Sequence, residues 1–202
     1  MLTLLQQNIN KDWIPLITGI PKRYQQYSFN NFIERGDKYK EAKLCCKEYF
    51  NYKSHKSGLF IGGPPGVGKT HLAVGTIRNL EIITENGIPR KAKAKMIDAD
   101  EYFNLLYNAI NSKQSKDKVI QELYRYNDVL LLDDLGLINM TMAKQENLYL
   151  LINYTYMHLS KIIITTNFTL DEFAKYDERI SSRLYEMCHI IVLTGEDYRL
   201  KQ

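Results

Sequence analysis

One segment of this chain, residues 62–70, constrains the fold more than any other. Its sequence GGPPGVGKT fits the pattern GxxxxGK[ST] from Gly63 to Thr70. It directly follows an apolar run at residues 58–61 and directly precedes a stretch of helical spacing at residues 69–85. In that strand–loop–helix context the motif folds around a phosphate. The segment therefore predicts an α/β domain with a phosphate site at the end of a central strand.

The chemistry of this loop suits a triphosphate. Its glycines allow successive backbone N–H groups to converge on phosphate oxygens, and the N-terminus of the following helix adds positive potential. We expect Lys69 to reach the β- and γ-phosphates and the hydroxyl of Thr70 to bind Mg²⁺. The sequence thus predicts binding of a nucleoside triphosphate. The loop residues expected at the nucleotide are Gly63, Pro64, Pro65, Gly66, Val67, Gly68, Lys69 and Thr70.

Five short runs predict the strands of the sheet. Four are apolar without polar alternation, as in central strands of a parallel sheet, and the run at 94–98 follows alternating lysines typical of an exposed edge strand. Segments with helical spacing separate the runs, which predicts a doubly wound parallel α/β sheet with helices on both faces. The expected strands are 58–61, 94–98, 129–132, 162–164 and 189–193, and the expected helices are 37–52, 69–85, 100–109, 116–126 and 143–158.

Length and composition limit the alternatives. A chain of 202 residues suits one domain, and we expect a tail at residues 1–20, a possible partner-binding segment, before a domain at 21–202. No apolar run approaches ~18 residues and no signal peptide is evident, so we expect a cytoplasmic protein without membrane contact. The net charge of +4 is compatible with nucleic acid without requiring it. The three cysteines lack zinc-ligand spacing.

Two acidic residues end the run at 129–132. A buried strand that ends in carboxylates places them at the carboxyl edge of a parallel sheet, where ligands bind. We expect Asp133 to hold Mg²⁺, directly or through water; a helix or turn cap is the alternative. We expect Asp134 to be the base that orients the attacking water. A structural role is its alternative, because aspartate is one methylene shorter than glutamate.

Polar residues also follow the run at 162–164. Asn167 lies at the tip of this expected strand, where its side chain suits a hydrogen bond to the γ-phosphate or to the lytic water. The alternative is an asparagine that only forms a turn. The sequence therefore offers a second polar group at the same edge of the sheet as Asp133.

The segment ERISSRL at residues 178–184 places two arginines four positions apart. Arg179 and Arg183 therefore share one face of a helix. An arginine delivered to the γ-phosphate of another subunit stabilises the charge of the transition state and accelerates hydrolysis by ~10³–10⁵-fold. The alternative is a solvated face with ion pairs to Glu178 and Glu186.

Taken in this order, the four elements resemble an AAA+ ATPase. More narrowly, they resemble the bacterial replicative-helicase loaders of the DnaC/DnaI type and the similar IstB-like transposition helper ATPases. The resemblance spans about residues 20–199, and its later motifs in this order are more specific than the phosphate loop alone. It rests on IPKRY and SFNNF at the entrance, GGPPGVGKTHLA, DDLG, ITTN and RISSRL.

The resemblance implies a five-stranded sheet of order 5-1-4-3-2, an ATP/ADP site with Mg²⁺, and assembly into a ring or spiral. It makes Arg183 the finger acting in trans, with Arg179 as the weaker candidate, and Asn167 the first sensor. It places Tyr24 near the adenine and adds His71 to the nucleotide-binding loop. The few residues after the last strand suggest that a helical lid is absent or vestigial, which leaves the role of Arg199 open.

Single-stranded DNA binding is also implied by the resemblance. Aromatic rings beside cations suit base stacking and backbone neutralisation, at ~1–3 kcal/mol per stacked base. The alternative is amphipathic helices with tyrosines in the core and lysines in water. The candidate carriers are Tyr102, Phe103, Tyr107, Lys113, Lys116, Lys118 and Arg125.

The function that this resemblance implies is an ATP-dependent loader of a hexameric replicative DNA helicase onto single-stranded DNA during replication initiation. We expect slow ATP hydrolysis that a partner stimulates. Two alternatives stay open: an IstB-like transposition helper, and a nucleotide-gated adaptor or inhibitor of a replication protein with negligible hydrolysis.

Overall fold

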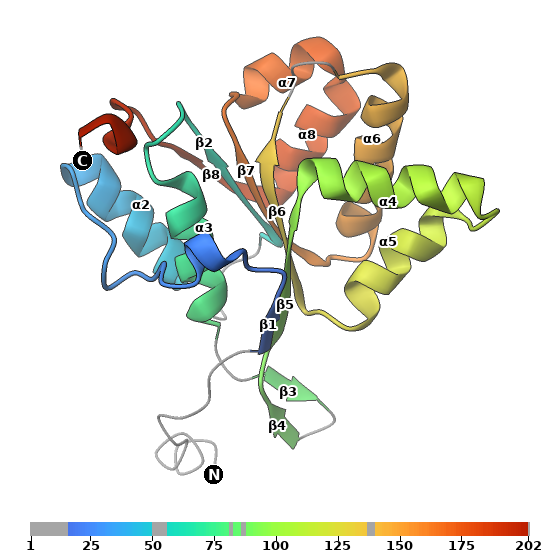
Figure 1. The fold of residues 1–202 in the computed structure, drawn as a ribbon, viewed down its shortest axis with the longest axis horizontal. Helices are drawn as coiled ribbons and strands as arrows, with labels where there is room; N and C mark the ends of the chain where they lie inside the picture. Colours follow the sequence, from blue (N-terminus) through green and yellow to red (C-terminus); the bar gives the residue numbers. More distant parts are fainter. Residues whose placement is uncertain (1–15, 50–55, 81–82, 86–87, 137–139, 202) are drawn as a thin grey trace.

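A six-stranded parallel sheet forms the centre of the computed structural model, which describes residues 16–49, 56–80, 83–85, 88–136 and 140–201 (Figure 1). The order across the sheet is β1-β5-β6-β7-β2-β8. The five predicted strands have the predicted relative order, 5-1-4-3-2 in chain order. The strands are β1 (Leu16–Thr18), β2 (Gly58–Gly62), β5 (Lys93–Asp98), β6 (Val129–Leu135), β7 (Lys161–Thr166) and β8 (Cys188–Val192).

The sixth strand, β1, corrects two expectations. It pairs in parallel with β5, so β5 is not the exposed edge that its lysines suggested. It also places residues 16–18, which we had assigned to the tail, inside the sheet. A strand of three residues is too short to show an apolar run, and only its backbone pairing reveals it: the Leu16 amide donates to the Ala92 carbonyl at 2.9 Å.

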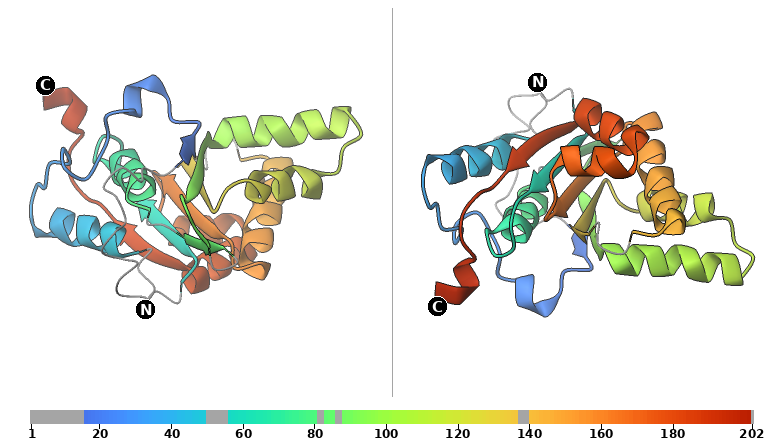
Figure 2. Two further views of the ribbon diagram at one scale, coloured as in Figure 1. Left: turned by 90° about the horizontal axis from the view of Figure 1, so that it is seen from below. Right: turned by 90° about the horizontal axis from the view of Figure 1, so that it is seen from above.

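Helices cover both faces of the sheet, as predicted (Figure 2). One face carries α2 (Asp37–Glu48) and α3 (Lys69–Arg78). The other carries α4 (Ala99–Asn111), α5 (Lys116–Arg125), α6 (Met142–Met157), α7 (Leu170–Tyr176) and α8 (Glu178–Met187). Short 3₁₀ turns, η1 (Lys22–Tyr24) and η2 (Tyr198–Lys201), flank this body.

The core divides because strand side chains alternate between faces. On β2, Leu59 and Ile61 pack with the α2–α3 layer, whereas Phe60 packs with the α4–α8 layer, and all three are fully buried. Burial on both faces explains why the central strands are continuous apolar runs. The polar residues that end these strands are thereby brought to one edge of a rigid sheet.

The predicted helix at 69–85 is too long, because the observed helix ends at Arg78. Helix α3 stops at Arg78, and the Asn79 amide caps it by donating to the Gly75 and Thr76 carbonyls. A small antiparallel hairpin follows, formed by β3 (Ile83–Glu85) and β4 (Ile88–Arg90). Its β-branched residues favour a strand over a helix. The stop expected at residues 86–87 lies outside the described residues.

Within the described ranges, no helix is long and apolar enough to cross a membrane.

Candidate nucleotide-binding site

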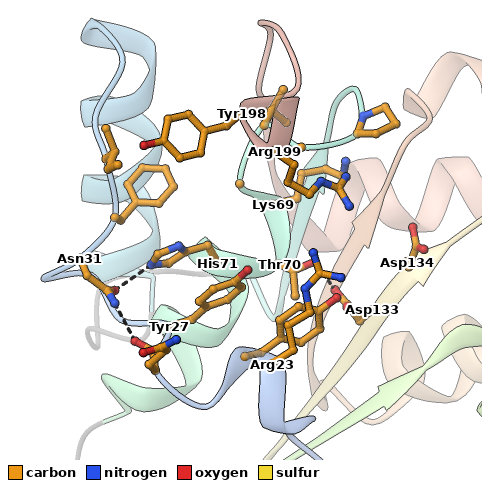
Figure 3. Close-up of a pocket in the computed structure, with 18 of the residues that line it drawn as sticks. Arg23, Tyr27, Asn31, Lys69, Thr70, His71, Asp133, Asp134, Tyr198 and Arg199 are labelled. Atoms are coloured by element: carbon orange, nitrogen blue, oxygen red, sulfur yellow. Dashed lines mark hydrogen bonds between the residues drawn. The ribbon is translucent and has the colours of Figure 1, made fainter. Parts of the chain in front are cut away.

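A cleft of about 600 Å³ lies at the carboxyl ends of β2, β6 and β7. Its floor is the loop between β2 and α3. One wall is the segment that contains η1, and the other is the chain around η2. Figure 3 shows the side chains of Arg23, Lys69 and Arg199 pointing into this cleft from three separate segments. Three cations in one cleft suit a polyanionic ligand.

The loop between β2 and α3 depends on glycine for its course. Gly68, the residue before α3, has φ 101°, and Gly66 has φ 72°, both in the left-handed region. A Cβ on Gly66 would also lie 1.6 Å from a carboxylate oxygen of Asp197. Glycine is therefore required for the turn and for the close approach of the chain near η2. The turn ends at the N-terminus of α3, where free N–H groups bind anions.

Lys69 lies at the centre of the cleft floor. Its side chain is 93% buried and its ammonium donates to the Gly63 carbonyl at 2.7 Å, the Pro64 carbonyl at 2.8 Å and Oδ1 of Asn167 at 2.7 Å. Burial lowers the pKa of Lys69, and the nearby charge of Asp134 opposes this. The ammonium is thus fixed by neutral oxygens, which a phosphate oxygen is able to replace.

Asp133 is buried on β6 and lies beside Thr70. Its Oδ1 accepts hydrogen bonds from the Thr165 hydroxyl at 2.6 Å and the Thr70 hydroxyl at 2.9 Å. Burial raises the pKa of Asp133, and these two hydrogen bonds oppose the rise. A buried carboxylate beside a hydroxyl is the hard oxygen donor set that suits Mg²⁺. The residues present therefore fit the metal site predicted at Thr70 and Asp133.

A β-bulge in β6 separates Asp133 from Asp134. Residues 132 and 135 pair with residues 164 and 166 of β7, so β6 has one extra residue at this point. Asp134 adopts φ 53°, and its amide donates to the Thr165 hydroxyl at 2.9 Å. Asp133 is consequently buried, while Asp134 is exposed and lines the cleft. The bulge explains how neighbouring carboxylates acquire different environments.

Asn167 follows β7 directly and lines the cleft. Its Oδ1 accepts the hydrogen bond from Lys69, which joins the start of α3 to the end of β7. The structure thus brings together Lys69, Thr70, Asp133, Asp134 and Asn167 from three separate segments, as the sequence predicted. Their roles at a nucleotide stay predictions.

Aromatic side chains form the opposite end of the cleft. Tyr24 stacks on Tyr27 with ring centroids 5.1 Å apart, and Tyr27 stacks on His71 at 4.3 Å with nearly parallel planes. The Nε2 of His71 lies 2.9 Å from the Ser28 carbonyl and 3.0 Å from Oδ1 of Asn31. Because both partners are acceptors, Nε2 carries the proton. Burial lowers the pKa of His71.

His71 and Tyr24 both line the cleft, as the expectation for the nucleotide required. The polar edge of His71, however, is already bonded to the 28–31 turn. Asn31 closes that turn, because its amide group donates to the Gln26 carbonyl at 2.8 Å and its Oδ1 also accepts from the Ser28 amide at 2.9 Å. His71 therefore connects α3 to the aromatic wall.

Several lining residues were not predicted from the sequence, among them Arg35, Tyr27 and Tyr198. The Arg35 guanidinium donates to the Val67 carbonyl at 2.9 Å, inside the phosphate-binding loop. A single arginine before a helix has no pattern that would have revealed this contact. Tyr198 belongs to the same short stretch as Arg199, whose guanidinium donates to Asp197 at 3.1 Å and faces the cleft (Figure 3).

The two arginines of α8 lie outside the cleft, against α6. Arg179 is paired with Asp177 at 2.7 Å and Glu146 at 3.0 Å, and these hydrogen bonds raise its pKa. Arg183 donates to the Asn153 side chain at 3.1 Å and the Arg179 carbonyl at 3.0 Å. Among the described residues no carboxylate pairs with Arg183. Arg179 is thus ion-paired, but to Asp177 and Glu146 and not to the expected Glu178 and Glu186.

The DNA-binding candidates divide into buried and exposed residues. Tyr102 is fully buried and donates to the Asn147 carbonyl, and Phe103 is only 7% exposed, so neither ring is available to stack on a base. Lys116 donates to the Asn147 side chain at 2.7 Å. For the two rings, the core alternative is correct. The exposed candidates are Tyr107, Lys113, Lys118 and Arg125.

Comparison with known proteins shows the family of this chain. A family model of the bacterial DnaA ATPase domain matches residues 24–190. The chain is 28% identical over 199 residues to the uncharacterised protein YqaM of Bacillus subtilis (strain 168), covering 91% of this chain and 60% of the length of YqaM.

Two solved structures extend the comparison. The DnaC helicase loader superposes with a TM-score of 0.67 at 26% identity, over 86% of this chain and 99% of that one. The replication initiator DnaA bound to AMPPCP and single-stranded DNA superposes with a TM-score of 0.62 at 19% identity, over 85% and 51%. With the match to the family model, the chain belongs to the bacterial DnaA ATPase-domain family and is an AAA+ ATPase of the DnaC/DnaI-like kind.

Proposed function

We propose that this replication-initiation AAA+ ATPase loads a hexameric replicative helicase onto single-stranded DNA under the control of bound ATP. The observation that carries the proposal is the likeness to the solved DnaC helicase loader, which spans 86% of this chain and 99% of that one, combined with a cleft whose phosphate end brings Lys69, Thr70, Asp133 and Asn167 together. Localisation in the cytoplasm, where chromosomal DNA lies in bacteria, accompanies this proposal.

Nucleotide binding would rearrange the contacts of Lys69. Its ammonium would exchange neutral oxygens for β- and γ-phosphate oxygens, which are charged and therefore better acceptors. Asn167, released from Lys69, would then be free to orient the γ-phosphate or the lytic water. Asp134, exposed at the bulge, would accept the proton of that water. Mg²⁺, held by Thr70 and Asp133, would neutralise charge on the phosphates.

Hydrolysis in this proposal needs a second subunit. Arg183 is half-buried on α8, has no carboxylate partner among the described residues, and lies outside its own cleft. We place it at the γ-phosphate of a neighbouring copy. Slow hydrolysis by the isolated chain and stimulation by assembly follow, because the transition-state charge lacks this cation in a monomer.

The arginine role has a direct test. Turnover per subunit should rise with protein concentration for the wild type, and Arg183→Ala should abolish that rise while ATP affinity stays within about twofold. Mixing Arg183→Ala with Lys69→Ala should restore part of the activity, because each variant supplies what the other lacks. Equal turnover by Arg183→Ala and wild type at high concentration would exclude the trans role.

Single-stranded DNA is the second partner in the proposal. The DnaA structure with AMPPCP and single-stranded DNA shows that this fold is able to hold both ligands. The exposed candidates on and between α4 and α5 are the residues that would contact DNA here. Charge reversal of Lys113 and Lys118 should weaken binding and reduce its salt dependence, because fewer counterions are released.

A loading assay tests the proposed function. The cognate helicase, circular single-stranded DNA coated with its binding protein, and ATP are mixed with this chain, and DNA-bound helicase is measured after gel filtration. Wild type should raise the bound fraction several-fold, and Lys69→Ala should not. Loading by Lys69→Ala at the wild-type level would contradict the proposal.

One observation favours a second candidate, a nucleotide-gated adaptor with negligible hydrolysis. Asp134 is short for a base and its backbone is held in the left-handed region by the bulge. If Arg183→Ala and Asp134→Ala leave turnover unchanged while ATP still drives partner binding, the adaptor describes the chain better than the loader.

A further inference from the structure

Arg35 joins three segments that are distant in sequence. One terminal nitrogen donates to the Val67 carbonyl in the phosphate-binding loop at 2.9 Å, and the other donates to the Glu196 carbonyl at 3.2 Å. Its guanidinium also lies over the ring of Tyr39 at 4.6 Å and the ring of Tyr198 at 5.3 Å. The planar fork of arginine suits this combination of two carbonyls and two ring faces, and lysine does not.

Other contacts also hold the segment of residues 194–199 against α2 and the phosphate-binding loop. The Tyr39 hydroxyl donates to the Thr194 carbonyl at 3.0 Å, and the Tyr198 amide donates to the Gly66 carbonyl at 3.2 Å. The absence of a side chain at Gly66 leaves room for Asp197, which would otherwise clash. Residues 194–199 therefore lie directly on the phosphate-binding loop.

This docking determines where Arg199 points. Asp197 accepts hydrogen bonds from the Arg199 amide at 2.9 Å and from its guanidinium at 3.1 Å, which orients the side chain toward the cleft (Figure 3). The charge of Arg199 lowers the pKa of Lys69 after the larger effect of burial, so the two cations are electrostatically close. Both are placed for the phosphates of one ligand.

We propose that Arg35 is a positioning residue: it holds residues 194–199 on the phosphate-binding loop so that Arg199 faces the terminal phosphates, and it thereby sets the preference for ATP over ADP. Arg35 acts through Arg199, because each of its terminal nitrogens already donates to a backbone carbonyl, one of Val67 and one of Glu196. The inference rests on the proposed nucleotide site and adds to it a residue outside the recognised motifs.

A double-mutant cycle on purified full chain tests the proposal. ATP and ADP affinities are measured by titration calorimetry for wild type, Arg35→Met, Arg199→Ala and the double variant. An arginine–phosphate hydrogen bond is strong enough that each single variant should lose about 10- to 100-fold in the ATP:ADP affinity ratio. The double variant should lose no more than Arg199→Ala, because both changes remove the same contact.

Matched variants separate positioning from folding. Lys43→Met removes the ion pair to Glu34, the neighbour of Arg35, without touching residues 194–199, and its ATP:ADP ratio should equal that of the wild type. Tyr39→Phe removes only the hydroxyl contact with Thr194, and it replaces Arg35→Met as the test variant if Arg35→Met does not fold. Tyr39→Phe should give a smaller loss of the ATP:ADP affinity ratio. Hydrogen exchange at residues 194–199 should rise in Arg35→Met but not in Lys43→Met.

The outcomes are distinct. An unchanged ratio in Arg35→Met, or a loss in the double variant that equals the product of the single losses, would overturn the positioning role. Failure of wild type to bind either nucleotide would instead contradict the proposed function.

Discussion

The two ends of the cleft are built differently. The phosphate end consists of strand ends and the loop between β2 and α3, and its key side chains, Lys69 and Asp133, are buried and hydrogen-bonded. The aromatic end consists of segments outside the sheet, and Tyr24, Tyr27 and His71 are only half-buried. The phosphate end is thus fixed by the topology of the sheet, and the aromatic end by contacts between chain segments. Mutations at the two ends should therefore have different signatures.

The largest effect should come from Lys69→Ala. Loss of the buried ammonium removes the main charge at the phosphate end, so affinity should fall by at least ~100-fold for ATP and for inorganic triphosphate alike. Titration calorimetry with both ligands measures this, and Lys40→Ala, on the exposed side of α2, is the control. A loss confined to ATP would mean that Lys69 does not bind phosphate.

Asp133→Asn should separate binding from turnover. We expect turnover to fall by about 100-fold, because a neutral amide is a poor Mg²⁺ ligand, while metal-free nucleotide affinity changes little. Steady-state hydrolysis at varied Mg²⁺ measures the first effect. If this variant hydrolysed ATP at the wild-type rate, Asp133 would not be a ligand of Mg²⁺.

The same variant has a pH signature. Burial raises the pKa of Asp133 above its ordinary 3.8. At pH values between the unfolded and the native pKa, the native state therefore holds a proton that the unfolded state has released. As pH rises through this range, the carboxyl lowers the free energy of unfolding. Asp133→Asn should therefore gain stability relative to wild type at pH 7.5 more than at pH 3.5. Thermal melts at the two pH values measure the difference, and an equal or opposite difference would refute the desolvation argument.

A smaller effect is expected at the aromatic end. Tyr27→Leu removes the middle ring of the stack, and the loss of two aromatic pairs should weaken ATP binding by roughly 3- to 10-fold. Binding of inorganic triphosphate should be unchanged, which makes the triphosphate its internal control. Equal losses for both ligands would mean that the two ends are not separable.

The smallest effect should come from His71→Gln. Loss of the hydrogen bonds to Ser28 and Asn31 should raise KM for ATP by about 2- to 5-fold with kcat unchanged, because His71 positions the wall without touching phosphate. Burial lowers the pKa of His71 below its ordinary 6.5, so wild-type stability should fall as pH drops below that value. His71→Gln should lack this component in melts at pH 5.5 and 7.5.

What the sequence predicted follows the same division. The helices on both faces and the gathering of Asp133, Asn167 and the loop were predictable from local patterns, because apolar runs mark buried strands and parallel strands end at one edge. The order of the strands was predicted from the family resemblance alone. At the phosphate end, only the placement of Arg199 by Arg35 and residues 194–199 needed knowledge of packing beyond the sheet.

The remainder depended on contacts that no local pattern encodes. Strand β1 is recognisable only from its pairing with β5. Arg35 became part of the site because a fold brings it against Val67 and Glu196, 32 and 161 positions away. Tyr102 and Phe103 looked like stacking residues because a tyrosine beside lysines looks the same in sequence whether its ring is buried or exposed.

In the proposed function, nucleotide in this cleft controls association with a replication partner. The most direct measurement is retention of the cognate replicative helicase on immobilised full chain with ATP, with ADP and without nucleotide. We expect retention that differs between ATP and ADP for wild type and is the same in all three states for Lys69→Ala. Equal helicase retention by wild type in all three nucleotide states would contradict it.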